Sequence, residues 1–102
     1  MITALVLFEF KGRSRAEAEK LFQESAPRYR AAPGLVRKYY LYDGEGERAG
    51  GAYLWKTRAD AETMYSADWR RSLRQRYGSD PQVSLFETPV IVDNQSGAIE
   101  SY

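Results

Sequence analysis

The sequence predicts an α+β fold of the ferredoxin-like type, a β-α-β-β-α-β chain with an antiparallel sheet and two helices on one face. Three observations lead to this fold class. Four segments are apolar and β-prone, two segments carry apolar residues at helical spacing, and the turn sequence "DGEGE" joins the second and third strands as a hairpin. The 102 residues are expected to form a single domain over 1–102.

The first two elements are a buried strand and an amphipathic helix. Residues 2–10, "ITALVLFEF", are almost continuously apolar, which is typical of a buried strand. Ser14 followed by Glu17 forms a capping box that starts a helix. Its inward positions are Ala18, Leu21, Phe22, Ser25 and Tyr29, and Pro33-Gly34 ends the segment.

Residues 35–42 and 49–56 are predicted to pair as a hairpin that turns about Glu45-Gly46. This register places Tyr40 opposite Gly51, Lys38 opposite Tyr53, and Val36 opposite Trp55. A slip of one residue would exchange all of these partners.

Thr57 is predicted to cap a second helix, with Asp60 at the box position and Gly78 at the end. Residues 66–68 could divide this helix into two pieces. Its inward positions are Ala61, Met64, Tyr65, Trp69 and Leu73. Residues 82–92 are predicted as one strand, and Pro89 places it at a sheet edge or in a bulge because proline has no N–H. The remaining tail is short and polar.

The composition excludes several classes of protein. The chain has no Cys and no His, so it lacks thiol nucleophiles, disulfides and imidazole acid–base groups, and no zinc or haem cofactor is expected. A net charge of +1 argues against a nucleic-acid partner or an acidic membrane partner. No run is long enough to span a bilayer and the start lacks signal-peptide features, so a cytoplasmic location is expected.

Aromatic residues are plentiful, and several fall on one face of the predicted hairpin. Lys38 and Tyr40 share that face with Tyr53 and Trp55, and Gly51 interrupts it. One interpretation is that Gly51 leaves a flat hollow for a ligand, which Tyr65 and Trp69 of the second helix help to close. The alternative is ordinary core packing, with the glycines forming a bulge and Lys38 extending to solvent.

Two helices cover only one face of a four-stranded sheet. The other face also carries apolar residues, so it is expected to be covered as well. A second copy of the same sheet is the simplest cover, which predicts a homodimer.

Three segments, "PGLVRKYYLY", "AGGAYLWKTRADAETMY" and "LFETPVIV", resemble the YdhR-type family of mono-oxygenases. That family belongs to the dimeric α/β-barrel superfamily, together with the antibiotic-biosynthesis mono-oxygenases. The resemblance implies a ferredoxin-like protomer and a homodimer whose sheets pack face to face. Haem enzymes of the superfamily commonly use a histidine ligand. The similar cofactor-free anthrone oxygenases use an Asn and a Trp, whereas the one asparagine here, Asn94, lies outside the predicted strands.

Two functions from different classes follow. The first is a cofactor-independent mono-oxygenase that acts on a small flat phenolic, quinol or polyketide-like aromatic. In it Lys38 and Tyr40 are the catalytic residues that stabilise the substrate anion, while Tyr53 and Trp55 stack on the ring. The second is a non-catalytic dimeric module for small-molecule binding or assembly, because no residue stands out as a catalytic base. The basic run "WRRSLRQRYG" is interpreted as a solvated helix end.

Overall fold

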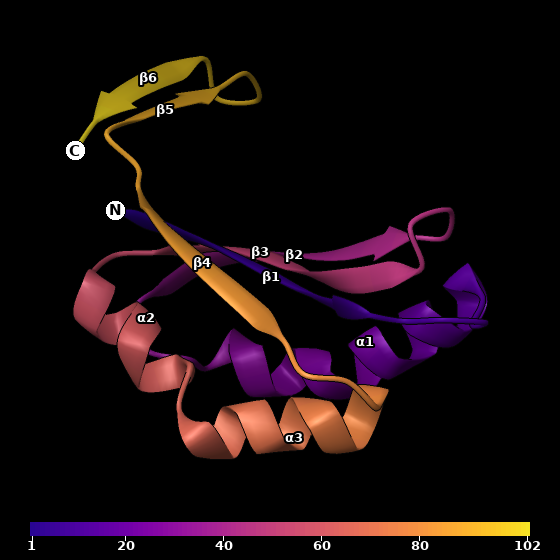
Figure 1. Ribbon diagram of the computed structural model, residues 1–102. Coiled ribbons are helices and arrows are strands. Elements are labelled where there is room, and N and C mark those ends of the chain that lie inside the picture. Colours follow the sequence, from indigo (N-terminus) through magenta and orange to yellow (C-terminus); the bar gives the residue numbers. More distant parts are fainter.

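The computed structural model describes all of residues 1–102. Three helices lie on one side of a four-stranded sheet, and a small hairpin projects on the other side (Figure 1). The elements are, in chain order, β1 Ile2–Glu9, α1 Arg15–Arg30, β2 Leu35–Asp43, β3 Arg48–Trp55, α2 Arg58–Met64, α3 Ala67–Tyr77, β4 Gln82–Glu87, β5 Val90–Asp93 and β6 Ala98–Ser101.

The large sheet has the strand order β2-β3-β1-β4, and all of its pairs are antiparallel. This arrangement confirms the predicted ferredoxin-like fold. In β1 every second residue, from Ile2 to Phe8, is buried against the helices. This alternation follows from the strand period of two, which sends successive side chains to opposite faces.

The β2–β3 hairpin has most of its predicted register. Tyr40 lies opposite Gly51 and Lys38 lies opposite Tyr53, as the turn at residues 44–47 requires. The expected pairing of Val36 with Trp55 is wrong, because the register shifts between Leu35 and Arg37. Leu35 takes the place opposite Trp55, and the side chain of Val36 is left 48% exposed.

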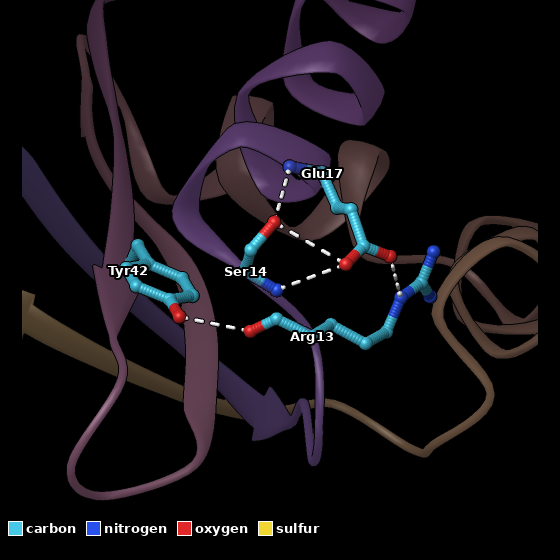
Figure 2. Close-up of polar contacts among 4 residues, drawn as sticks. All are labelled: Arg13, Ser14, Glu17 and Tyr42. Atoms are coloured by element: carbon cyan, nitrogen blue, oxygen red, sulfur yellow. Dashed lines mark hydrogen bonds and ion pairs between the residues drawn. The ribbon is translucent and has the colours of Figure 1, made fainter.

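A complete set of polar partners fixes the start of α1 (Figure 2). The N–H of Glu17 donates to Oγ of Ser14 at 3.1 Å, and the N–H of Ser14 donates to Oε1 of Glu17 at 3.1 Å. These bonds lower the pKa of the Glu17 carboxyl. Arg13 forms an ion pair with Glu17 at 3.6 Å, and the hydroxyl of Tyr42 donates to the carbonyl of Arg13 at 2.8 Å. The predicted capping box is confirmed, and it also connects β2 to the helix.

The second helical region is divided into α2 and α3. Oγ1 of Thr57 caps α2 by accepting from the N–H of Asp60 at 3.0 Å. Oγ of Ser66 caps α3 by accepting from the N–H of Trp69 at 3.2 Å. Gly78 ends α3 with a left-handed backbone, φ +83°. The predicted division of the segment is confirmed at Ser66, which separates α2 from α3, whereas Ala67 and Asp68 belong to α3.

The prediction of a single strand over 82–92 is wrong. The strand ends at Glu87, and β5 starts after Pro89 in a different direction. β5 pairs with β6 in a separate hairpin on the side of the sheet away from the helices, so the tail is not a simple polar extension (Figure 1). Oδ1 of Asp93 accepts from the N–H of Gln95 at 2.9 Å and closes the turn between the two strands.

The face of the sheet away from the helices keeps large apolar side chains in contact with solvent. Tyr39 on β2 is 55% exposed and Phe86 on β4 is 54% exposed. No helix of the structure has both the length and the apolar character needed to cross a membrane.

Candidate functional site

A cleft of about 530 Å³ lies between the helix-covered face of the sheet and helices α1 and α3. The strands contribute its floor, including Val6, Lys38, Tyr40 and Tyr53. α1 and α3 contribute its walls, with Tyr29 from α1 and aromatic, polar and charged residues from α3. The strand–helix interface thus holds an aromatic cleft with polar groups along its helical walls.

Lys38 is the unusual group in this cleft. Its Nζ lies 3.3 Å from the ring centroid of Tyr29, 3.8 Å from that of Tyr40 and 4.6 Å from that of Tyr53. It makes no ion pair with a carboxylate. Burial, and secondarily the positive charge of Arg28, lower the pKa of the Lys38 amine to about 6. At neutral pH most molecules therefore hold a neutral amine with a free lone pair in the cleft.

The three tyrosine rings also prepare Lys38 to hold a proton. The negative face of an aromatic ring attracts a cation within about 6 Å. A proton that the amine takes from a bound molecule would therefore be retained among three ring faces. This is the behaviour expected of a general base whose conjugate acid remains beside the substrate anion.

The glycine pair of β3 has two different roles. A Cβ on Gly50 would lie 1.8 Å from the carbonyl oxygen of Val6, so the close approach of β1 requires glycine. A Cβ on Gly51 would lie 3.0 Å from Cε1 of Tyr53 and 3.2 Å from Cε of Lys38. The space beside Gly51 is therefore filled by the lysine stem and the Tyr53 ring. The hollow expected beside Tyr40 is absent, and the cleft lies further toward the helices.

Tyr40 is held in place by two neighbours from α1. Its ring stacks on Phe22, with centroids 4.6 Å apart and an interplanar angle of 25°. Its hydroxyl shares a hydrogen bond of 2.7 Å with Oγ of Ser25. Burial is the main cause that raises the pKa of the Tyr40 hydroxyl, so this group stays protonated. Oγ of Ser25 donates to the carbonyl of Phe22 at 3.1 Å, so the Tyr40 O–H donates to Ser25 and reaches an oxyanion by turning toward it.

The other predicted site residues form an aromatic cluster behind the cleft. Trp55 and Trp69 are each only 1% exposed and do not line the cleft. Nε1–H of Trp55 donates to the hydroxyl of Tyr65 at 2.9 Å, and Nε1–H of Trp69 donates to the hydroxyl of Tyr29 at 2.9 Å. The cluster therefore orients Tyr29 and Tyr53, whose rings contact Lys38.

Several residues of the cleft were not identified from the sequence. Arg28 and Tyr29 are adjacent on α1, and Arg76 and Tyr77 are adjacent on α3, and all four line the cleft. The repeated Arg-Tyr pair was the available signal. The pair places a cation beside an inward-facing aromatic residue on each helix. The interpretation of the basic run as a solvated helix end did not take this pairing into account.

The donors of the cleft do not suit a haem or a metal ion. No group of three or more His, Cys, Asp or Glu residues comes together, and the chain has neither His nor Cys. Tyrosinate is a further haem ligand, but burial raises the pKa of Tyr77 to about 12 and raises that of Tyr53 further. Deprotonation of these hydroxyls is therefore disfavoured, so we derive no chemistry through a haem.

The fold is shared with solved structures at low sequence identity. SnoaB from Streptomyces nogalater, described as a cofactor-independent oxygenase, is 19% identical with a TM-score of 0.63 over 85% of this chain and 91% of its own. An antibiotic biosynthesis mono-oxygenase assigned in Deinococcus radiodurans is 11% identical with a TM-score of 0.69 over 91% and 97%. A MhuD mutant with manganese protoporphyrin IX bound is 17% identical with a TM-score of 0.71 over 92% and 100%. These likenesses establish the shared fold.

Among curated proteins, none matches the chain. One family model matches residues 4–88, which include most of β1, the other three strands of the large sheet and all three helices. The matched segment contains Lys38, the aromatic cluster and both Arg-Tyr pairs. The chain therefore belongs to the family described as "Putative mono-oxygenase ydhR".

Proposed function

We propose that this protein is a cofactor-independent mono-oxygenase that acts on a flat phenolic, quinol or polyketide-like aromatic bound in the cleft. The observation that carries the proposal is Lys38, a half-buried amine with a lowered pKa among three tyrosine rings. The family description supports mono-oxygenase chemistry in general. SnoaB, which is described as a cofactor-independent oxygenase, supports the cofactor-free form of it.

The first step is a proton transfer. The neutral Nζ of Lys38 accepts the acidic proton of the substrate, from a phenol O–H or from a C–H next to a conjugated carbonyl. The resulting ammonium stays beside the substrate anion and stabilises it. The hydroxyl of Tyr40, positioned by Ser25, donates to the oxygen on which the negative charge develops.

The second step is the reaction of this anion with dioxygen, for which the substrate supplies all the electrons. In an anthrone-type substrate a methylene carbon bonds to one oxygen atom and loses both of its hydrogens. The O–O bond breaks, one oxygen remains as the new carbonyl, and the other leaves as water with the two hydrogens. The protonated Lys38 returns its proton to the departing oxygen, which restores the neutral amine.

The direct test is oxygen uptake with a panel of anthrones and dihydroxynaphthalenes, together with mass spectrometry of the product in ¹⁸O₂. The proposal predicts one labelled oxygen per product and one dioxygen consumed per turnover. Absence of uptake with every member of the panel would contradict it. If the same compounds bind saturably without uptake, the result favours the alternative, a non-catalytic binding module.

A homodimer is part of this proposal. The exposed Tyr39 and Phe86 support it, because an apolar sheet face without helices is stabilised when a second sheet covers it. A groove between this face and the β5–β6 hairpin, lined in part by Leu54 and Val92, extends the same surface. Sedimentation should give a dimer at micromolar protein, and Phe86→Glu should shift it toward monomer. A wild-type monomer at all concentrations would contradict the dimer.

A further inference from the structure

One arginine of the cleft has no acidic partner. Arg76 forms an ion pair with Glu24 at 3.4 Å, and Glu24 is the one acidic residue among those that line the cleft. Arg28 makes no ion pair, and Nη1 of Arg28 donates only to Oγ of Ser72, at 3.4 Å. A guanidinium and a hydroxyl therefore meet where α1 and α3 border the cleft, and the guanidinium keeps most of its donors free.

Arg28 and Lys38 both contact the ring of Tyr29. Cζ of Arg28 lies 5.9 Å from the ring centroid, and Nζ of Lys38 lies 3.3 Å from it. Because both distances are measured to the same ring centroid, the two cationic groups lie no further apart than the sum of the two. A two-ring aromatic acid is long enough to reach both groups. The charge of Arg28 disfavours a proton on Lys38. An anion bound at Arg28 would reduce this repulsion.

We propose that the cleft selects aromatic carboxylates: the carboxylate binds Arg28 where α1 and α3 meet, and the ring extends along Tyr29 toward Lys38. The planar guanidinium suits the two oxygens of a carboxylate. The Ser72 hydroxyl donates to the carbonyl of Trp69 at 2.7 Å, and its oxygen accepts from Nη1 of Arg28, so Ser72 orients the guanidinium. Arg28 is thus a specificity-determining residue, and it leaves the reacting part of the substrate to Lys38. This inference takes from the proposed function only that the cleft is the binding site.

The test uses 2-naphthoate and its neutral analogue 2-naphthamide, neither of which has an oxidisable phenol or an acidic C–H. In calorimetry of the folded wild-type protein, naphthoate should bind at least about tenfold more tightly than naphthamide, as expected for a charge-assisted bidentate contact. Arg28→Gln should remove this preference and leave naphthamide binding unchanged. Arg30→Gln, on the same helix but outside the cleft, is the matched control and should keep the preference.

A second readout reports on Lys38. Naphthoate binding at pH 7.5, measured in buffers with different heats of ionisation, should take up a proton, because the bound anion favours the ammonium form. Lys38→Met should abolish this uptake, and Arg30→Gln should preserve it. Equal affinity for the two probes, absence of binding by both, or a preference that survives in Arg28→Gln would each overturn the inference. Failure of the oxygen-uptake panel would instead contradict the mono-oxygenase proposal, since these probes report binding alone.

Discussion

The charged groups at the start of α1 have polar partners, whereas Lys38 has no anionic partner. At the helix start, Ser14 and Glu17 satisfy each other and Arg13 pairs with Glu17, although all of these groups can reach water (Figure 2). Lys38 is half-buried among rings and has no anion beside it. An isolated buried cation costs stability. The comparison indicates that the first region serves the fold and that the second retains an unfavourable group for a ligand.

The largest effect is expected when the amine of Lys38 is removed. Lys38→Met keeps most of the side-chain volume and removes the base. Oxygen uptake with an accepted substrate should fall about 10²–10⁴-fold, the usual contribution of general base catalysis. Lys56→Met, at an exposed position after β3, is the matched control and should retain wild-type rates. Equal rates for the wild type and Lys38→Met would remove the lysine from the mechanism.

The same variant should be more stable than the wild type. The folded-state pKa of Lys38, about 6, is below the unfolded value of about 10.4, so between these values the unfolded chain binds a proton that the folded chain lacks. The wild-type free energy of unfolding should therefore rise with pH from about 6 to about 10. Lys38→Met should lack this rise and be more stable at pH 7, by an amount on the order of 4–5 kcal/mol. Urea denaturation of both proteins across this pH range measures the difference, and parallel curves would contradict it.

The two adjacent glycines of β3, Gly50 and Gly51, should differ in how much stability an added side chain costs. Gly50→Ala brings Cβ against the backbone oxygen of Val6 and should cost about 2–4 kcal/mol, because a backbone atom cannot move without displacing β1. A Cβ on Gly51 would lie 3.0 Å from Cε1 of Tyr53, 3.1 Å from the carbonyl oxygen of Tyr39 and 3.2 Å from Cε of Lys38, so Gly51→Ala makes less severe contacts and should cost less. Thermal denaturation of the two variants tests this order, and the reverse order would mean that the neighbours of Gly51 cannot shift.

The smallest effect is expected at the start of α1, where Ser14 caps the helix. Ser14→Ala removes the N-cap acceptor and should destabilise the protein by about 1 kcal/mol without changing substrate binding. Ser14→Asp keeps an acceptor and should remain close to wild type. Chemical denaturation measures the first effect and calorimetry with 2-naphthoate the second. A loss of ligand affinity in Ser14→Ala would show that the helix start is coupled to the cleft.

Local signals in the sequence were sufficient for the fold and for part of the site. The turn near Glu45-Gly46 fixes the hairpin register, and this register places Lys38 opposite Tyr53. The pairing of Val36 with Trp55 and the single strand over 82–92 were predicted wrongly. Both depend on how a strand enters or leaves the sheet, which the alternation of apolar residues does not report. The role of Arg28 could not be predicted, since its neighbour Ser72 is brought close only by the packing of α1 against α3.

The protonation state of Lys38 decides whether the cleft holds a base at neutral pH, and heteronuclear NMR of the lysine Nζ measures this state most directly. Protein labelled with ¹³C and ¹⁵N lysine would be titrated without ligand, and Lys38→Met would identify the resonance. We expect a Lys38 resonance that titrates near pH 6. A Lys38 Nζ that stays protonated up to about pH 10, near the value of a lysine in a model peptide, would contradict this expectation, because the cleft would then hold no base at neutral pH.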